Sequence, residues 1–173
     1  MRDPAAMTGG EVLGRSAERE VLLLMDRPEL SVTWSRFAAG RRGAEPHVHH
    51  EHTDCFYVLA GELTVTVGPD FERVALGEGG FLAAPPDVIH GFDNDGDSEV
   101  RYLNLHSPDC GFIAYMRAIR DGTEVGAWDS FDPPADGGRP RSEAAISAPG
   151  EDLNLDRPEL ALVERFLSAH LPG

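Results

Sequence analysis

Three histidines and an aspartate occupy two short segments of the chain, and these residue types are the ones that hold transition metals. His47 and His49 are one residue apart, Asp54 follows across a short gap, and His90 stands in a second segment. Alternate side chains of a strand point the same way, so His47 and His49 can face one cavity. Neutral imidazoles with one carboxylate suit Fe, Mn, Ni, Co, Cu or Zn. The sequence therefore predicts one divalent transition metal, of open identity, held by His47, His49, Asp54 and His90.

Two further histidines, His50 and His52, lie in the same run as the first pair. If His50 and His52 were the metal-binding pair instead, the residue at the spacing of Asp54 would be Tyr57, which has no carboxylate. This disfavours His50 and His52 as ligands. We interpret His50 and His52 as solvated residues at the rim of the site. The alternative is that His47 and His49 are themselves surface imidazoles in a polar loop.

Other polar side chains near the cluster allow more than one interpretation. Asn104 and His106 alternate with leucines, so they either face the cavity beside the ligands or lie on the surface. Cys55 is expected to point away from the cavity into packing. Arg36 and Arg101 are expected to form ordinary salt bridges rather than to bind an acidic substrate.

Composition excludes several classes of function. The net charge of −15 disfavours binding to nucleic acid. All 15 basic residues are arginines, so no lysine Schiff base can operate. The longest strongly apolar run, residues 21–25, is too short to span a membrane, and no apolar leader follows the N-terminus. These features predict a cytoplasmic protein whose partner is a small molecule rather than nucleic acid or membrane.

Short apolar runs separated by Gly, Pro, Asn and Asp dominate the chain up to residue 107. Many short strands without intervening helices predict an all-β barrel or sandwich. The predicted strands cover residues 21–25, 31–38, 56–59, 63–67, 71–76, 80–83, 88–92 and 100–106.

The segments outside this barrel differ in character. Residues 1–20 are expected to form an irregular N-terminal arm, with a short helix near Ser16, and residues 21–107 to form the barrel. In 108–173 we expect a helix that starts at Ser107 or Asp109 and ends at Gly122. A Pro/Gly-rich strap over 126–152 and an amphipathic terminal helix over 158–171, packed on the barrel, are expected to follow.

The two histidine segments together resemble the two motifs of the cupin superfamily. The residues that fit the first motif are His47, His49 and Gly61, with Asp54 where glutamate is usual. The residues that fit the second are Gly79, Pro85, His90 and Asn94, with Asp87 where glycine is usual. Aspartate is shorter than glutamate by roughly 1.5 Å, so the backbone must approach the metal, or Asp54 binds it weakly or through water.

The resemblance implies a fold and a set of functions. The fold would be a double-stranded β-helix, or jelly roll, and the C-terminal extension is similar to those of bacterial quercetin-dioxygenase-like cupins. The implied function is a non-haem, metal-dependent oxygenase acting on a small organic molecule, with Asp54 as a catalytic base, or else an isomerase or decarboxylase. The alternative is a non-catalytic small-molecule binder or sensor with a weak or vacant metal site. Bacterial single-domain cupins also imply a homodimer, and whether the protein is an enzyme stays open.

Overall fold

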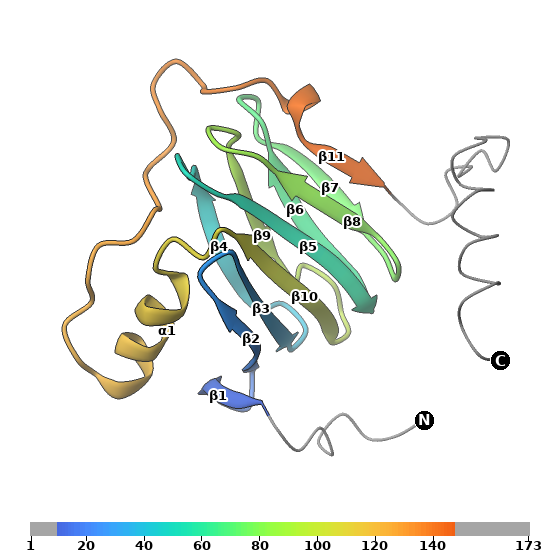
Figure 1. Cartoon of the computed structure of the whole chain (residues 1–173). Coiled ribbons are helices and arrows are strands. Elements are labelled where there is room, and N and C mark those ends of the chain that lie inside the picture. Colours follow the sequence, from blue (N-terminus) through green and yellow to red (C-terminus); the bar gives the residue numbers. More distant parts are fainter. Residues whose placement is uncertain (1–9, 148–173) are drawn as a thin grey trace, which may run out of the picture.

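Two antiparallel β-sheets face each other in the computed structural model of the chain, which describes residues 10–147 (Figure 1). The larger sheet has the strand order β1-β2-β3-β10-β5-β8-β11, and the smaller has the order β4-β9-β6-β7. The strands are β1 (Glu11–Arg15), β2 (Arg19–Arg27), β3 (Leu30–Phe37), β4 (Arg42–His47), β5 (Thr53–Ala60), β6 (Leu63–Val67), β7 (Glu72–Leu76), β8 (Phe81–Ala84), β9 (His90–Asp93), β10 (Val100–Ser107) and β11 (Ala145–Ser147). This is the predicted all-β jelly roll. The terminal helix expected over 158–171 lies outside the described residues.

Three strands occur where the sequence indicated none. β1 lies in the expected irregular arm, and β4 lies just before the first histidines. β11 lies in the expected strap and pairs with the edge of β8. The short helix near Ser16 was also predicted wrongly. The Ser16 hydroxyl instead accepts the backbone N–H groups of Glu18 and Arg19 in the turn between β1 and β2, a local bond that favours turns over helices.

The core lies between the two sheets and consists of side chains that alternate along the strands. In β5 and β10 every second side chain is buried, as expected for strands with one face toward a core. Besides Phe37 and Tyr102, the buried core includes Phe56, Val58, Leu63, Val65, Val67, Leu76, Leu82 and Val100. The same inward-facing rows carry the polar residues of the site, so strand register places both the core and the site.

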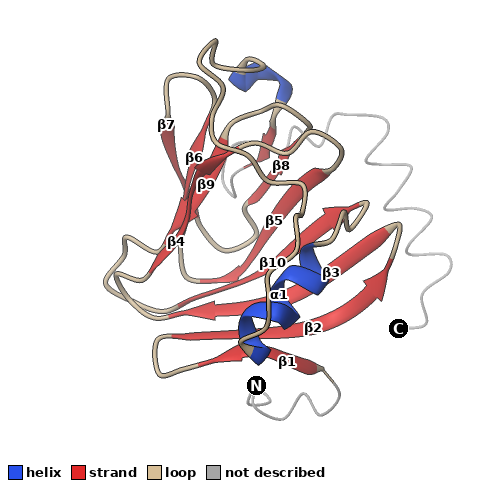
Figure 2. Ribbon diagram, turned by 90° about the vertical axis from the view of Figure 1, so that its left-hand side faces the viewer, coloured by secondary structure: helices blue, strands red, loops and turns tan. Residues whose placement is uncertain are grey.

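Helix α1 (Phe112–Asp121) covers one end of the larger sheet (Figure 2). The Asp109 carboxylate accepts the N–H groups of Gly111 and Ile113 at its start. Gly122, with a φ of 64°, ends it in the left-handed conformation. The predicted end at Gly122 is confirmed, whereas the helix begins at Phe112 with Gly111 as its N-cap, two residues after Asp109. The apolar face of α1 contributes to a second buried cluster that consists of Leu13, Val21, Leu23, Ile113 and Met116.

The residues after α1 cross the molecule as a strap, residues 123–144, that ends at the edge of the larger sheet. Phe131 pairs with Val48 through two backbone hydrogen bonds. The Arg139 N–H donates to the Asp87 carbonyl oxygen at 2.8 Å. These contacts hold the strap beside the segment that follows β4, where the histidines stand.

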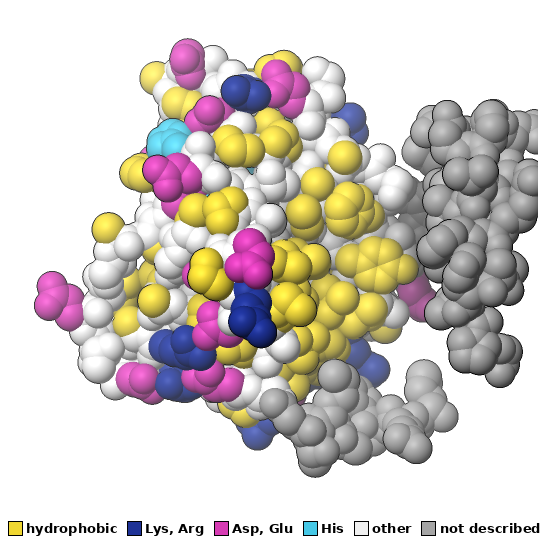
Figure 3. All heavy atoms as spheres, in the orientation of Figure 1, with side chains coloured by type: hydrophobic (Ala, Val, Ile, Leu, Met, Phe, Trp, Pro, Cys, Tyr) yellow, Lys and Arg dark blue, Asp and Glu magenta, His cyan; other side chains and the backbone are white. Residues whose placement is uncertain are grey.

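Hydrophobic side chains gather on the face shown in Figure 3. The exposed large hydrophobic residues include Leu24 and Met25 of β2, and Tyr57 and Leu59 of β5. The pairing of two copies, which the resemblance implied, stays a prediction. No helix in the described part of the chain is long and apolar enough to cross a membrane.

Candidate metal centre

The four predicted ligands come together from three strands and one loop. His47 ends β4, His49 follows it, Asp54 lies near the start of β5, and His90 starts β9. β4 and β9 are neighbours, and His47 is paired with His90 in their register. One potential ligand atom from each of the four residues lies within 4.8 Å of the others. The expected cluster is therefore assembled by the fold, while its occupation by a metal stays a prediction.

All three histidines of the cluster are oriented by backbone carbonyl groups. The Nδ1 contacts run from His47 to Glu45 O (2.7 Å), from His49 to Asp129 O (2.5 Å) and from His90 to Val88 O (2.9 Å). A carbonyl oxygen can only accept a hydrogen bond, so each Nδ1 carries the proton and each Nε2 presents a lone pair. This is the arrangement that metal-binding histidines adopt.

The Nε2 atoms of the two buried histidines converge on Asp54. Its Oδ2 atom lies 3.6 Å from Nε2 of His49 and 3.3 Å from Nε2 of His90. Both Nε2 atoms are buried and have no hydrogen-bond partner. Ligand atoms about 2.1 Å from one ion, at angles near 90–110°, lie roughly 3.0–3.4 Å apart. These separations fit a shared metal, and the shorter aspartate side chain reaches the histidines directly.

The protonation states also suit metal binding. Burial, and then the neighbouring His90, lower the pKa of His47 to about 3, so its imidazole is neutral at pH 7. Burial alone would raise the pKa of Asp54, but His106, His49 and His90 together hold it well below its usual range. Metal ligands must be deprotonated, and here this requires no proton release from these two groups at neutral pH.

A second pair of histidines, His52 and His106, connects the cluster to the strap. His52 is only 1% exposed, so its assignment to the solvated rim was wrong. Its Nδ1 atom lies 2.7 Å from Oδ2 of Asp129, and its Nε2 atom lies 3.0 Å from Nδ1 of His106. His106 Nε2 lies 2.9 Å from Asn104 Oδ1, and Asn104 Nδ2 lies 2.5 Å from Asp54 Oδ1. Asn104 and His106 therefore face inward, one of the two positions that the sequence allowed.

Asp129 is the site residue that sequence reasoning missed. Its carboxylate accepts the backbone N–H groups of His50 and Glu51, both at 2.8 Å, in addition to its contact with His52. Its carbonyl oxygen orients His49. Nothing in the local sequence distinguishes it from the other acidic residues of the strap, because its partners lie almost 80 residues away.

His50 and Asp87 form a small group at the surface. His50 is exposed, as predicted, and its Nδ1 atom lies 2.6 Å from Oδ1 of Asp87. Asp87 has a φ of 66°, a conformation that glycine adopts most easily, which accounts for the glycine usual at this point of the motif. The Asp87 N–H donates to the His49 carbonyl oxygen at 2.7 Å, so this strained turn also supports the cluster.

The comparisons with known proteins agree with the observed fold. Residues 33–106 match the family model described as a cupin domain. The chain therefore contains a cupin domain over these residues. KdgF from Halomonas sp. is similar in structure, with a TM-score of 0.50, 22% identity and coverage of 57% of this chain and 86% of that one. An RmlC-like cupin from Shewanella frigidimarina has a TM-score of 0.48, 25% identity and coverage of 57% and 84%. No curated protein matches the sequence.

These similarities concern the fold of this cupin. The resemblance to quercetin-dioxygenase-like members stays a prediction. So does the role of each site residue, because fold alone does not assign function.

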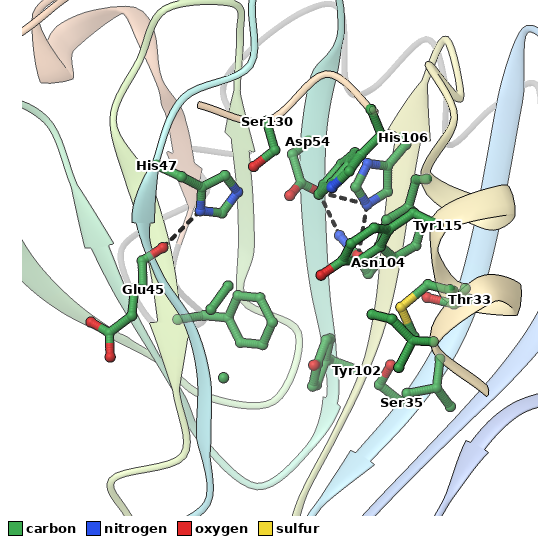
Figure 4. A pocket seen from close by; sticks show the side chains of 18 of the residues that line it. Thr33, Ser35, Glu45, His47, Asp54, Tyr102, Asn104, His106, Tyr115 and Ser130 are labelled. Carbon is green, nitrogen blue, oxygen red and sulfur yellow. Dashed lines mark hydrogen bonds and ion pairs between the residues drawn. The ribbon is translucent and has the colours of Figure 1, made fainter. Parts of the chain in front are cut away.

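A cavity of about 430 Å³ opens beside the cluster of this cupin (Figure 4). His47 and Asp54 lie on opposite walls at one end, with His106 next to Asp54. The rest of the wall includes six aromatic side chains, those of Phe37, Phe92, Tyr102, Phe112, Tyr115 and Trp128. A volume of this size suits a small organic molecule.

The remaining candidates have structural explanations. Burial raises the pKa of Cys55 to about 11, with the Asp54 charge adding to the shift, so its thiol is unreactive at neutral pH. Arg36 and Arg101 both pair with Glu99, at 3.2 and 2.8 Å, which confirms the expected salt bridges.

Proposed function

We propose that this cupin is a metal-dependent enzyme of the oxygenase type that acts on a small organic molecule. The observation that carries the proposal is the pair of buried Nε2 atoms of His49 and His90, which have no hydrogen-bond partner and lie within 3.6 Å of the Asp54 carboxylate. A buried polar atom without a partner costs about 1–3 kcal/mol. One divalent metal ion bound by both atoms would offset this cost.

The residues that would hold the metal are His47, His49, His90 and Asp54. A bound transition metal would supply a Lewis acid with open positions for substrate and oxygen. The protein's own contribution is to fix the ligands before binding. Each imidazole is held through Nδ1 by a backbone carbonyl, and Asn104 donates to the other oxygen of Asp54.

Asp54 fits the role of ligand better than that of base. Its pKa is held well below the usual range, and a general base works best with a pKa near the working pH. In addition, Asn104 already occupies its Oδ1 atom. The catalytic role considered for Asp54 therefore stays a prediction, with ligation as its main task in this proposal.

The aromatic wall would bind and shield the substrate. Trp128 lies above His49, with ring centroids 5.3 Å apart, and Phe112 stacks on His106 at 3.9 Å. These rings keep water away from one side of the cluster, which strengthens electrostatic interactions there. A non-catalytic binder with a weak metal site is the alternative. It is favoured by the fact that Asn104 leaves Asp54 one oxygen for the metal.

Elemental analysis of the purified protein, before and after reconstitution with Fe, Mn, Ni, Cu or Zn, tests the metal site. We expect about one equivalent in the wild type and a large loss in His49→Ala. His50→Ala is the matched control, because His50 lies in the same run but is exposed and bound to Asp87. Equal metal content in all three proteins, or none in any, would contradict the site.

Oxygen uptake distinguishes the enzyme from the binder. The metal-loaded protein is screened in an oxygen electrode with small aromatic and keto compounds that fit the cavity. We expect uptake that His49→Ala abolishes and His50→Ala retains. If a compound instead binds equally well to the metal-loaded and the metal-stripped protein without uptake, the protein is a binder.

A further inference from the structure

Arg19 lies at the end of the cavity that is remote from the metal centre. It is one of the cavity-lining residues and starts β2. The strand register shows how far it is from the cluster. Arg19 pairs with Phe37, and Phe37 pairs with Val100 of β10, whereas Asp54 pairs with His106 of β10. Positions 100 and 106 are six steps apart on β10, or roughly 20 Å between backbones at about 3.3 Å per residue.

Arg19 is a charged group in the cavity wall that forms no ion pair with any other described residue. Of the arginines in the described residues, only Arg19 and Arg27 form no ion pair, and Arg27 is exposed whereas Arg19 is half-buried. The acidic neighbours of Arg19 are already engaged. Glu18 pairs with Arg41, and Glu20 pairs with Arg15 and Arg36.

The wall between Arg19 and the metal centre is apolar with a few hydroxyl groups. Phe37 and Phe92 line the cavity, and Figure 4 shows Tyr102, Thr33 and Ser35 on the part of the wall away from His47 and Asp54. Burial raises the pKa of Tyr102, so its phenol stays neutral and adds no charge to this wall. The cavity wall outside the metal centre also carries two carboxylates. Glu45 pairs with Arg42 at 2.9 Å, and Asp132 is exposed on the strap.

A half-buried guanidinium without a partner needs an anion, and its planar donors match a carboxylate. We propose that Arg19 binds the carboxylate of an elongated, largely apolar substrate whose opposite end reaches the metal centre. This inference deepens the proposed function and rests on it for the chemistry at that opposite end. The strongly acidic chain, with a net charge of −15, repels anions in general, so the selection would come from Arg19 itself.

The test compares carboxylic acids with their uncharged amides. The probes are ω-phenylalkanoates with four to eight carbons in the chain, each paired with the corresponding primary amide, and binding is measured by isothermal titration calorimetry on the full-length, metal-loaded protein. We expect the best acid to bind at least about tenfold more tightly than its amide, because only the carboxylate forms charge-assisted hydrogen bonds with the guanidinium. Arg19→Gln should abolish this preference, and Arg19→Lys should restore part of it.

Arg27→Gln is the matched control, because Arg27 lies on the same strand and is exposed. It should retain the preference for acids. The proposal is overturned if wild type shows no preference in any acid–amide pair, or if Arg19→Gln keeps it. Metal content measured in the same samples separates the two hypotheses. A preference for acids in a protein that takes up no metal refutes the metal-dependent function alone, and metal uptake without the preference refutes the role of Arg19 alone.

Discussion

Two groups of histidines lie side by side in this cupin and differ in what their ring nitrogens contact. The first group consists of His47, His49 and His90, and in each of them Nδ1 is hydrogen-bonded to a backbone carbonyl oxygen. The Nε2 atoms of His49 and His90 have no hydrogen-bond partner among the described residues. In the second group, His52 and His106, both ring nitrogens contact side chains. The groups touch, since the rings of His49 and His52 stack with centroids 3.8 Å apart.

We propose that this difference separates histidines that could bind a metal from histidines that position their neighbours. A free, buried Nε2 atom is available to an ion, whereas a nitrogen already bonded to a side chain is not. The second group instead links Asp129 on the strap to Asn104, which donates to Asp54. Its role is therefore to hold the carboxylate of the first group in place.

Replacing one histidine from each group should give the largest contrast. We expect His90→Ala to weaken Zn²⁺ binding by about a thousandfold, because it removes a direct ligand. His106→Ala should weaken it by roughly tenfold, because it removes only a neighbour of the ligand Asp54. Competition titration with a chromophoric chelator measures both affinities. Similar losses in the two variants would remove the distinction between the groups.

The second contrast concerns Asp129, which contacts both groups. Asp129→Ala leaves the N–H groups of His50 and Glu51 without their acceptor and frees one nitrogen of His52. We expect the free energy of unfolding to fall by about 2–4 kcal/mol, as measured by urea denaturation of the metal-free protein. Asp132→Ala is the control on the same strap, since Asp132 is exposed, and it should change stability by less than about 0.5 kcal/mol. Equal effects would show that the strap, rather than the Asp129 carboxylate, matters.

The first group could be predicted from the sequence, and the second could not. His47 and His49 are spaced for one face of a strand, and with Asp54 and His90 they form a recognisable pattern. The contacts of His52 depend on Asp129, which is 77 residues away. No periodicity reports such a contact, and the spacing of His50 and His52 equals that of the proposed ligand pair, His47 and His49. The sequence therefore could not tell which of these two was buried.

The same limit applies to the fold. The alternation of apolar residues and threonine over 63–67 predicted a strand with the same bounds as β6, because alternate side chains of this strand pack in the core. β4 escaped prediction because it contains Gly43, Glu45 and Pro46, which are poor strand formers. β4 lies at the edge of the smaller sheet, where proline is tolerated. β4 is a strand because it pairs with β9, with His47 opposite His90. Local residue propensities do not report such long-range pairing.

The third and smallest expected effect is the dependence of stability on acid pH. Burial lowers the pKa of one histidine in each group. Burial lowers the pKa of His47 to about 3 and that of His106 to about 4, whereas an unfolded histidine titrates near pH 6.5. Below pH 6.5 the unfolded chain therefore binds more protons than the native protein, so stability falls with falling pH, down to about pH 4. Each buried histidine contributes a slope of up to about 1.4 kcal/mol per pH unit.

Urea denaturation of the metal-free protein between pH 7.5 and pH 5 should show this decline. His47→Gln and His106→Gln should each reduce the slope by up to about 1.4 kcal/mol per pH unit, because each removes one titrating group. Saturating Zn²⁺ then sharpens the comparison. It should add stability to the wild type and to His106→Gln at neutral pH, but much less to His47→Gln, which lacks a ligand. An unchanged slope in His47→Gln would mean that its imidazole is solvated in the native protein and does not belong with the buried ligands.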